Sequence, residues 1–484
     1  MLLFFGLLTT DRLYIDDIGR STSGESGWSG VGRPLADILI TLLHLGTPLN
    51  NMFPLPQIIS LCFISVTCTL LSRTYSIKSP IIAAVCTLPL VGQPYYLENM
   101  SYSFDSPSMT LALSFSVCAA MSLADTRKCS FIISVILTFL ALNLYQPSVG
   151  AFCVTYMFLV IKNVNVTIKP HKYLITHVTR ITACAGLAFL LYVPIAKKFA
   201  VADYAVLHSK LIGVHNAYGR IFDNTAYYIR ALLGDWSGNI AGYIFAFIFV
   251  SFLIVSLVQT IWSGHSFSVG RRNLLYAVLS LVLGLLTVVA SYFPQMFLEN
   301  PLLFPRMFIG FGALLSCCCL YVWSALEAKE FGLGKYEQYI KAIPVCLVAY
   351  ALITFSYSYS RANAAQKQYE DIVISGLIAE ADALMANTAF THFTIIGQIG
   401  HSPLVRNTIR KYPLISALVP IHIKDNWMWG HAQLTSLGLN LKGFDMPKEE
   451  VSVIVSTHKP VVNKSRYAIY ARDHLMVIRF YDPW

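Results

Sequence analysis

Residues 14–37 read YIDDIGRSTSGESGWSGVGRPLAD, a polar stretch near the start of a mostly apolar chain. Its neighbouring carboxylates, Asp16 and Asp17, repel each other, so one of them can have a raised pKa and act as a base. A solvated turn is the simpler interpretation of such a pair. Further charged residues in the same stretch are candidates for substrate binding: Arg20, Glu25, Arg33 and Asp37.

The local structure of this stretch follows from its Gly, Ser and Pro residues. The Ser, Thr and Gly residues at 21–24 and 26–30 predict a loop rather than a helix. Pro34 suits the first position of a short helix that continues to Leu45. One side of that segment is apolar, which is typical of a helix lying on a membrane surface.

The composition predicts a polytopic membrane protein that is mainly α-helical. The chain has 484 residues, of which 56% are apolar and 12% charged, whereas soluble domains carry about 25% charged residues. A transmembrane helix needs about 20 apolar residues, and about eleven stretches approach that length, the first being too short to cross alone. They lie near residues 1–10, 53–72, 79–96, 108–124, 129–144, 147–161, 181–195, 240–262, 274–293, 307–326 and 342–357.

Positive charges near the span ends predict the orientation, because cytoplasmic loops carry an excess of Lys and Arg. The basic loops contain Arg73, Lys78, Arg127, Lys128, Lys162, Lys169, Lys172, Arg271, Arg272, Lys329, Lys335 and Lys341. These loops and the N-terminus are predicted to be cytoplasmic, and in a bacterium such a multi-pass protein lies in the inner membrane. The alternate segments are predicted to be periplasmic: 11–52, 97–107, 196–239, 294–306 and the tail 358–484.

The acidic residues favour one class of membrane protein. Of the 25 Asp and Glu residues, none lies in the apolar centre of a predicted span. Those outside the periplasmic segments are Asp125, Glu327, Glu330 and Glu337. Ion-coupled transporters usually keep ionisable groups at membrane depth. The pattern therefore favours an enzyme that acts at the outer membrane surface on a lipid-borne substrate.

The positions of the cysteines and the absence of cofactor motifs limit which disulfide, metal and cofactor sites the chain is expected to contain. All 11 cysteines fall in or beside predicted spans, which excludes a disulfide framework or a thiol-based zinc site outside the membrane. No Walker loop, Rossmann glycine fingerprint or HExxH motif occurs. No metal site or cofactor is predicted, the need for a divalent cation is left open, and no nucleic-acid partner is expected.

Two other outer segments contribute charged candidates. Glu98 and Asp105 in loop 97–107 are expected to reach the same surface as Asp16. Arg306 stands at the start of a span and suits pairing with a lipid phosphate, although an interface anchor explains it equally.

The long outer loop 196–239 interleaves aromatic residues with cations, and His215 and Arg220 are its candidates. Such a pattern suits sugar stacking combined with phosphate pairing. It is equally typical of an interfacial aromatic belt with Lys and Arg side chains that extend toward water.

The tail differs in composition and predicts a small α/β domain. A helix is expected over 359–384, and Trp427 and Trp429 are candidates for stacking on a sugar, with core packing as the alternative. The last two of its strands are expected to pair through the turn at 472–474. The predicted strands cover 393–400, 451–457, 467–471 and 475–481.

The run IDDIGRS, followed by Trp28 and by GRPLAD at 32–37, precedes a multi-span body and an outer C-terminal domain. In this respect the chain resembles the serotype-converting O-antigen glucosyltransferases of prophages, the Gtr group, which are placed with the GT-C glycosyltransferases. The resemblance implies a GT-C-like catalytic module at residues 1–357 and a periplasmic domain at 358–484. It also implies a polyprenyl-phosphate-glucose donor, a lipid-linked O-antigen acceptor and dependence on a donor synthase and a flippase.

In GT-C enzymes an acidic residue just after the first span acts as the base or orients the acceptor, and that role maps to Asp16 or Asp17. Sugar transfer from a lipid phosphate needs the same groups. A carboxylate removes a proton from the attacking sugar hydroxyl, and a fixed cation stabilises the lipid phosphate that leaves. One-step displacement with inversion is expected by analogy. The candidate cations are Arg20, Arg33, Arg220 and Arg306.

Other functions stay open at this point. Transfer of another sugar or of phosphoethanolamine is a second enzymatic interpretation. A flippase or transporter of lipid-linked sugars, and a non-catalytic scaffold for surface-polysaccharide assembly, are interpretations from other classes. Membrane lipid is an expected partner under each of them.

Overall fold

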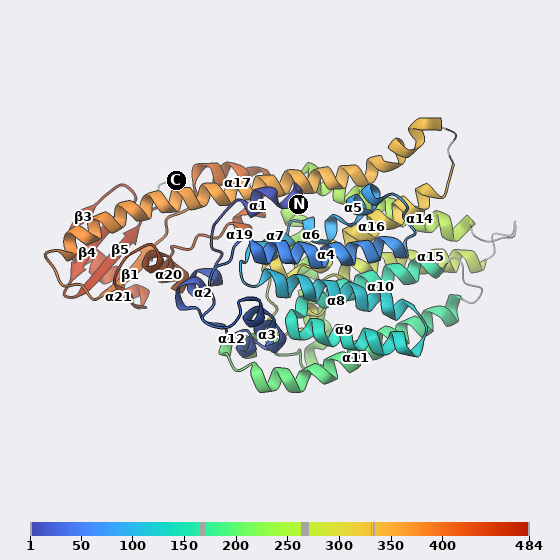
Figure 1. The fold of residues 1–484 in the computed structure, drawn as a ribbon, viewed down its shortest axis with the longest axis horizontal. Coiled ribbons are helices and arrows are strands. Elements are labelled where there is room, and N and C mark those ends of the chain that lie inside the picture. Colours follow the sequence, from blue (N-terminus) through green and yellow to red (C-terminus); the bar gives the residue numbers. More distant parts are fainter. Residues whose placement is uncertain (1, 165–169, 263–270, 331, 333, 483–484) are drawn as a thin grey trace.

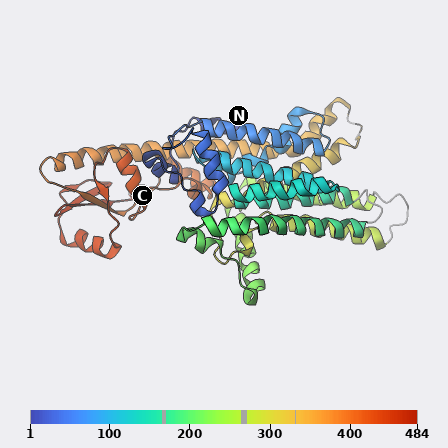
Figure 2. The same ribbon diagram turned by 60° about the horizontal axis from the view of Figure 1, so that its bottom comes forward.

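The computed structural model describes residues 2–164, 170–262, 271–330, 332 and 334–482. A bundle of long helices forms one end of an elongated molecule, and a small sheet with its helices forms the other (Figure 1). Figure 2 shows that the sheet stands clear of the bundle ends. The helix that opens with the paired aspartates, α2 (Asp16–Ser23), lies between these two parts.

The bundle contains the long apolar helices. They are α4 (Leu55–Thr74), α5 (Pro80–Thr87), α6 (Pro89–Gly92), α8 (Ser106–Ala124), α9 (Lys128–Leu144), α10 (Val149–Val164), α11 (Pro170–Phe199), α14 (Ile240–Trp262), α15 (Arg271–Ala290), α16 (Gly310–Glu327) and α17 (Glu337–Met385). A single turn, η7 (Gly334–Tyr336), precedes α17.

Shorter helices precede the first of these spans or lie between spans along the chain. They are η1 (Leu2–Phe4), α1 (Phe5–Leu8), η2 (Ser29–Val31), α3 (Pro34–Leu43), α7 (Tyr96–Ser101), η3 (Gln146–Ser148), α12 (Asp203–Ser209), η4 (Val214–Asn216), α13 (Ala217–Trp236), η5 (Gln295–Phe297) and η6 (Pro305–Met307). Among them, α3 and α12 lie at the end of the bundle that faces the sheet (Figure 1).

The fold confirms a mainly helical polytopic membrane protein. Among the described residues, seven helices are long and apolar enough to cross a membrane. Other stretches of the predicted set form shorter apolar helices, because Pro89 interrupts the stretch 79–96 and α9 ends after 17 residues. The N-terminal stretch forms only η1 and α1, which pack on α17.

The connecting segments lie at two opposite ends of the bundle. The end of α4, with Arg73, and the turn from α8 to α9, with Arg127, lie at the end far from the sheet (Figure 1). The segments holding α2, α3 and α12 lie at the opposite end. The assignment of these ends to cytoplasm and periplasm stays a prediction.

The tail begins without a break, because α17, 49 residues long, runs through the bundle and on past it, and it confirms the helix expected at 359–384. A five-stranded sheet of order β2-β1-β5-β4-β3 follows. Strands β4 and β5 pair antiparallel through the turn expected at 472–474, and β1 pairs parallel with β5. The sheet and its helices comprise β1 (His392–Gly397), α18 (Pro403–Lys411), α19 (Ile415–Leu418), α20 (Met428–Ser436), β2 (Lys442–Gly443), α21 (Lys448–Thr457), β3 (Val462–Asn463), β4 (Tyr467–Arg472) and β5 (Leu475–Phe480).

Two local predictions are wrong. Residues 451–457 belong to helix α21 rather than to a strand, because Pro447 and the acidic Glu449 and Glu450 favour a helix start. Its buried residues include Val451 and Ile454, three positions apart, as on one face of a helix.

The predicted loop at 21–24 is also wrong in part, because α2 continues to Ser23 and ends at Gly24, whose φ of 70° suits glycine. Pro34 does open α3, which ends at Leu43. The orientation of α3 relative to a membrane surface stays a prediction.

Candidate active site

Helix α2 gives its two aspartates different surroundings. Asp17 is fully buried, and its carboxylate accepts hydrogen bonds from the backbone N–H groups of Ser103 at 2.6 Å and Phe104 at 3.3 Å. Asp16 keeps 39% of its side chain exposed, and its Oδ2 lies 3.6 Å from Nη1 of Arg20, one helical turn on. Asp17 therefore fastens α2 to the segment after α7, whereas Asp16 remains accessible.

The pKa values of these two groups move in the same direction. Burial raises the pKa of Asp17 well above its usual range, while the two backbone N–H donors oppose the rise. Burial also raises the pKa of Asp16, and the positive charge of Arg20 opposes it. A carboxylate with a raised pKa holds a proton more tightly and is a stronger base once ionised.

Asp105 lies at the centre of the charged groups near α2. Its Oδ2 is 3.3 Å from Nη1 of Arg20, and its Oδ1 is 4.0 Å from Nη1 of Arg33. The indole Nε1–H of Trp28 donates to Oδ1 at 2.6 Å, and the guanidinium of Arg20 lies over the Trp28 ring at 4.3 Å. One buried carboxylate thus holds two arginines and a tryptophan from the Tyr14–Asp37 stretch in place.

Arg33 has a second set of contacts with the turn between α9 and α10. Its guanidinium lies 4.6 Å from the centre of the Tyr145 ring, and its Nε–H donates to Oε1 of Gln146 at 3.3 Å. The amide of Gln146 in turn donates to the Tyr192 hydroxyl at 2.6 Å and to the Gly32 carbonyl at 3.3 Å. The 4.0 Å separation from Asp105 leaves Arg33 less tightly paired than Arg20.

Glu98 and Arg306 form a tight ion pair. Nη1 of Arg306 lies 2.6 Å from Oε1 of Glu98, its backbone N–H donates to Oε2 at 2.7 Å, and Nη1 also donates to the Tyr102 hydroxyl at 2.9 Å. Burial raises the pKa of Glu98, which the positive charge of Arg306 opposes. Burial raises the pKa of Tyr204 on α12, and the positive charges of Arg306 and Arg33 oppose the rise.

These side chains form what we call the acid–arginine cluster. It consists of Asp16, Asp17, Arg20, Arg33, Glu98, Asp105 and Arg306. They come from α2, from the turn between η2 and α3, from α7, from the residue before α8 and from η6. Segments almost three hundred residues apart in the sequence therefore meet at one end of the bundle.

Other predicted site residues lie outside this cluster. Glu25 is exposed. Asp37 accepts backbone hydrogen bonds from Gly27 at 3.3 Å and Ser29 at 2.8 Å, which makes it a support of the loop. Burial would raise the pKa of Asp37, but hydrogen bonds from Ser29 and Gly27 outweigh burial and lower it. His215 and Arg220 are exposed near and on α13.

The two tryptophans of the tail differ in their contacts. A Cβ atom at Gly19 of α2 would lie 2.7 Å from Cζ3 of Trp429, so the Trp429 ring packs directly on the helix that carries Asp16. Trp427 precedes α20 and lies beneath Nζ of Lys424 at 4.2 Å. Trp429 is thus part of the support of α2, and Trp427 belongs to the surroundings of Lys424.

A buried ion pair fixes the chain just before α2. Nη2 of Arg12 lies 3.0 Å from Oε1 of Glu370 on α17, and Nη1 donates to Oδ1 of Asn363 at 2.8 Å. Nη2 of Arg12 also donates to the Pro420 carbonyl at 2.8 Å, and Gln433 on α20 donates to Glu370 at 3.2 Å. These contacts connect the N-terminal segment to the tail.

Several of these residues were missed by sequence reasoning. Tyr145 and Gln146 are not among the predicted site residues, although a Gln placed between two apolar spans is a usable signal. Nothing in the sequence relates Arg12 to Glu370, because the partners are 358 positions apart. Trp28 was visible in the motif, but its hydrogen bond to Asp105 was not.

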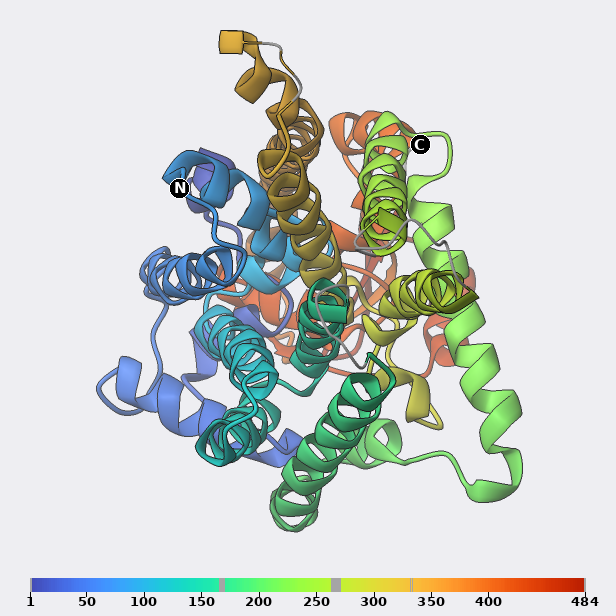
Figure 3. The same cartoon turned by 90° about the vertical axis from the view of Figure 1, so that its right-hand side faces the viewer.

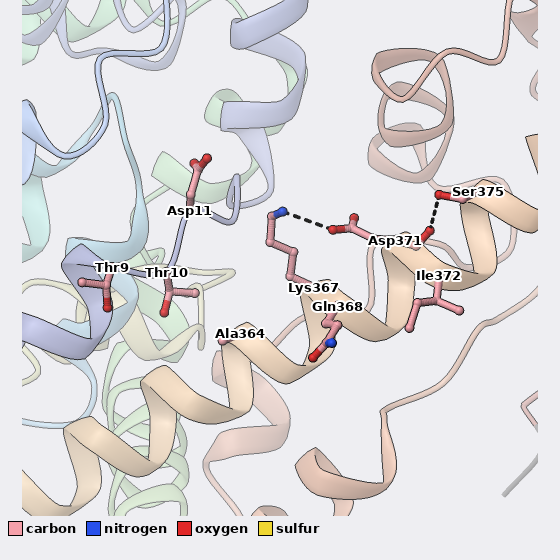
Figure 4. A pocket seen from close by; sticks show the side chains of 9 residues that line it. All are labelled: Thr9, Thr10, Asp11, Ala364, Lys367, Gln368, Asp371, Ile372 and Ser375. Atoms are coloured by element: carbon pink, nitrogen blue, oxygen red, sulfur yellow. Dashed lines mark hydrogen bonds and ion pairs between the residues drawn. The ribbon is translucent and has the colours of Figure 1, made fainter.

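A cavity of about 750 Å³ lies elsewhere, between residues 9–11 and α17 (Figure 4). Lys367 and Asp371, which are 3.1 Å apart, lie on its α17 side, and Asp11 lies on the other. Neither Asp16 nor Asp17 lines it. Among the described residues, no three His, Cys, Asp or Glu side chains gather in a way that could hold a metal ion, and the need for a divalent cation stays an open prediction.

Comparison with known proteins identifies the family. Residues 5–317, which contain the whole acid–arginine cluster, match the family model for the glucosyl transferase GtrII. An uncharacterized 55.3 kDa protein from the gtrB 5′ region of Salmonella phage P22 is 28% identical over 432 residues, covering 88% of this chain and 85% of that protein. No solved structure matches the chain. These matches confirm the resemblance to the Gtr group: the chain is a polytopic glycosyltransferase that belongs to the GtrII glucosyl transferase family.

Proposed function

We propose that this glycosyltransferase moves glucose from polyprenyl-phosphate-glucose to a sugar of lipid-linked O-antigen at the periplasmic face of the inner membrane. The observation that carries the proposal is the half-exposed Asp16 beside Arg20 and the less tightly paired Arg33. A carboxylate next to fixed guanidinium groups is the pair that sugar transfer from a lipid phosphate requires. The donor is expected to come from a separate synthase and to reach this face through a flippase.

In the proposed reaction, Asp16 is the general base. An acceptor hydroxyl oxygen attacks the anomeric carbon of the donor glucose, and the proton of that hydroxyl passes to the Asp16 carboxylate. The bond from the anomeric carbon to the phosphate oxygen breaks, and polyprenyl phosphate leaves with the electron pair. The attack and departure take place on opposite sides of the carbon, so the configuration inverts.

Arg20, Arg33 and Arg306 differ in how closely each is paired with a carboxylate, and their proposed roles follow from that difference. Arg33 is the strongest candidate for the leaving phosphate, because its nearest carboxylate oxygen is 4.0 Å away, whereas Arg306 is held by Glu98 at 2.6 Å. Arg20 lies between Asp16 and Asp105 and fixes the charge beside the base. A cation aimed at the charge that develops on a leaving group stabilises the transition state.

A matched pair of substitutions tests the assignment of the base. Asp16→Asn removes a partly exposed carboxylate, and the rate of glucose transfer by the purified chain is expected to fall by about 10²–10⁴-fold with little change in thermal stability. Asp17→Asn replaces an acceptor of two backbone N–H groups and is expected to lower stability, by about 1–3 kcal/mol. Wild-type-like transfer by the Asp16→Asn variant would refute the role of Asp16.

The same assay tests the function itself. Purified chain in lipid is incubated with polyprenyl-phosphate-glucose and lipid-linked O-antigen, and the product is analysed by mass and linkage. A branched, glucose-bearing product that requires both substrates is expected. Flipping of the intact donor without transfer would instead support the transporter interpretation.

A further inference from the structure

A lateral arm, residues 200–236, leaves the bundle after α11 and returns at α14. It contains α12, η4 and α13. Large apolar side chains along it are exposed: Val201, Val206, Leu207, Leu211, Val214, Tyr218, Phe222 and Leu233. Exposed apolar side chains mark a contact with a partner or a membrane when they share one face.

One face of α13 is fixed to the bundle end. The ring of Tyr228 stacks on Tyr292 with centroids 4.5 Å apart, and its hydroxyl is 2.6 Å from Oγ of Ser291. The amide of Asn224 donates to the carbonyls of Met296 at 3.1 Å and Leu298 at 2.9 Å. These contacts determine which sides of α13 turn away from the protein.

The outward-facing part of α13 is divided between an apolar and a charged face. At about 100° per residue, Tyr218, Phe222 and Leu233 fall within one sector, and they are 88%, 63% and 65% exposed. Arg220, Asp223, Tyr227 and Arg230 are exposed in the next sector. Each face, including the packed one, takes roughly a third of the circumference, which is the pattern of a helix lying in a membrane interface.

The direction of α13 agrees with this pattern. Figure 3 looks along the spans, and the light-green helix α13 runs across the picture rather than end-on. After a three-residue turn the chain enters the span α14 at Ile240, and exposed Tyr243 and Phe247 follow on that helix. The apolar face of α13 is therefore continuous in the chain with the lipid-facing surface of an adjacent span.

We propose that α13 lies in the membrane interface at the sheet end of the bundle, with Tyr218, Phe222 and Leu233 inserted among lipids. Arg220 and Arg230 then lie at the level of the head groups, where cations are favoured. The proposal goes beyond the transfer reaction, because it assigns a lipid surface to a part of the chain outside the acid–arginine cluster.

The arm also connects the interface to the cluster. The backbone N–H of Ala202 donates to the Gly30 carbonyl at 3.3 Å, next to the η2 turn. Lys210 pairs with Glu299 at 2.7 Å, and the Leu211 backbone bridges to Leu298. Through these contacts the arm holds η2, which precedes Arg33, and the segment that precedes Arg306.

Two tyrosines on the same helix provide a matched test. Tyr218→p-benzoyl-phenylalanine on the apolar face and Tyr227→p-benzoyl-phenylalanine on the charged face are made in the full-length chain, irradiated in cell membranes and analysed for phospholipid adducts by mass. Phe222→p-benzoyl-phenylalanine is a second probe of the apolar face. Positions 218 and 222 are expected to give several-fold more phospholipid adduct than position 227.

Each other outcome overturns the proposal. Equal adduct yields at all three positions would mean that α13 does not lie with one face in lipid. Cross-links from 218 and 222 to a second protein chain would make the apolar face a protein interface, and no adduct at either would place it in water. The readout needs no glucose transfer, so its failure is distinguishable from failure of the proposed function.

Discussion

The ion pair between Arg12 and Glu370 gives the sharpest prediction about how the site is held. The two side chains are only 3% and 0% exposed, and they join the segment before α2 to helix α17. Removing one charge of a buried pair leaves the other uncompensated, which costs about 3–5 kcal/mol. Glu370→Met and Arg12→Met are therefore each expected to destabilise the chain by about that amount.

The double variant is expected to cost much less than the sum. With both charges removed, the apolar side chains fill similar space, and such replacements of buried pairs are often close to neutral. What remains is the loss of the hydrogen bonds from Arg12 to Asn363 and Pro420 and of those that Glu370 accepts from Gln366 and Gln433, at about 1 kcal/mol each. The coupling energy of the cycle is thus expected to be several kcal/mol.

The measurement is denaturant unfolding of the purified full-length chain in mild detergent, followed by tryptophan fluorescence, with glucose transfer assayed on the same samples. The single variants are expected to lose transfer along with stability, because α2 follows Arg12 closely. Additive costs in the double variant, or single costs below about 1 kcal/mol, the range of an exposed pair, would refute the reasoning.

Two further predictions concern α2 itself. Gly19→Ala places a Cβ 2.7 Å from Cζ3 of Trp429 and is expected to cost about 1–3 kcal/mol by overpacking; adding Trp429→Leu is expected to restore the thermal unfolding temperature, and no recovery would contradict the contact. Because burial raises the pKa of Asp16, and because the base works only when ionised, the transfer rate is expected to fall as the pH drops through that raised pKa, above the usual range of about 4. Arg20→Gln removes a charge that lowers this pKa, so the inflection in the pH–rate profile should move to higher pH, and an unmoved or lowered inflection would argue against Asp16 as the titrating base.

The fold class could be predicted from the sequence because membrane helices are specified locally. A run of about 20 apolar residues determines a span without reference to its neighbours. Local rules also sufficed for Pro34 at the start of α3 and for the hairpin at 472–474. They failed at 451–457, where β-branched residues suggested a strand but the start signals at 447–450 and one buried face make a helix.

The candidate site could be predicted only in part, for a physical reason. Arg20, Asp105 and Arg306 could be named because they are charged residues in segments that connect the apolar spans. Charged side chains are costly to bury without a partner, so those in connecting segments are expected to pair at the end of the bundle. Which partner each finds depends on the tertiary fold. The separation of Asp16 from Asp17 into an accessible and a fastened carboxylate was therefore invisible in the sequence, since it arises from the backbone at 103–104.

The charge balance of the acid–arginine cluster links binding to catalysis in the proposed mechanism. Its acids outnumber its arginines, and burial raises the pKa of Asp16, Asp17 and Glu98. A donor phosphate bound by Arg33 brings one more negative charge near Asp16, and a like charge raises a carboxyl pKa further. The base is then strongest when the donor is in place, and it takes the acceptor proton at the stage when the leaving phosphate has its cation. A donor without its phosphate would lose both effects, so the phosphate contributes to the rate of the chemical step and to binding alike.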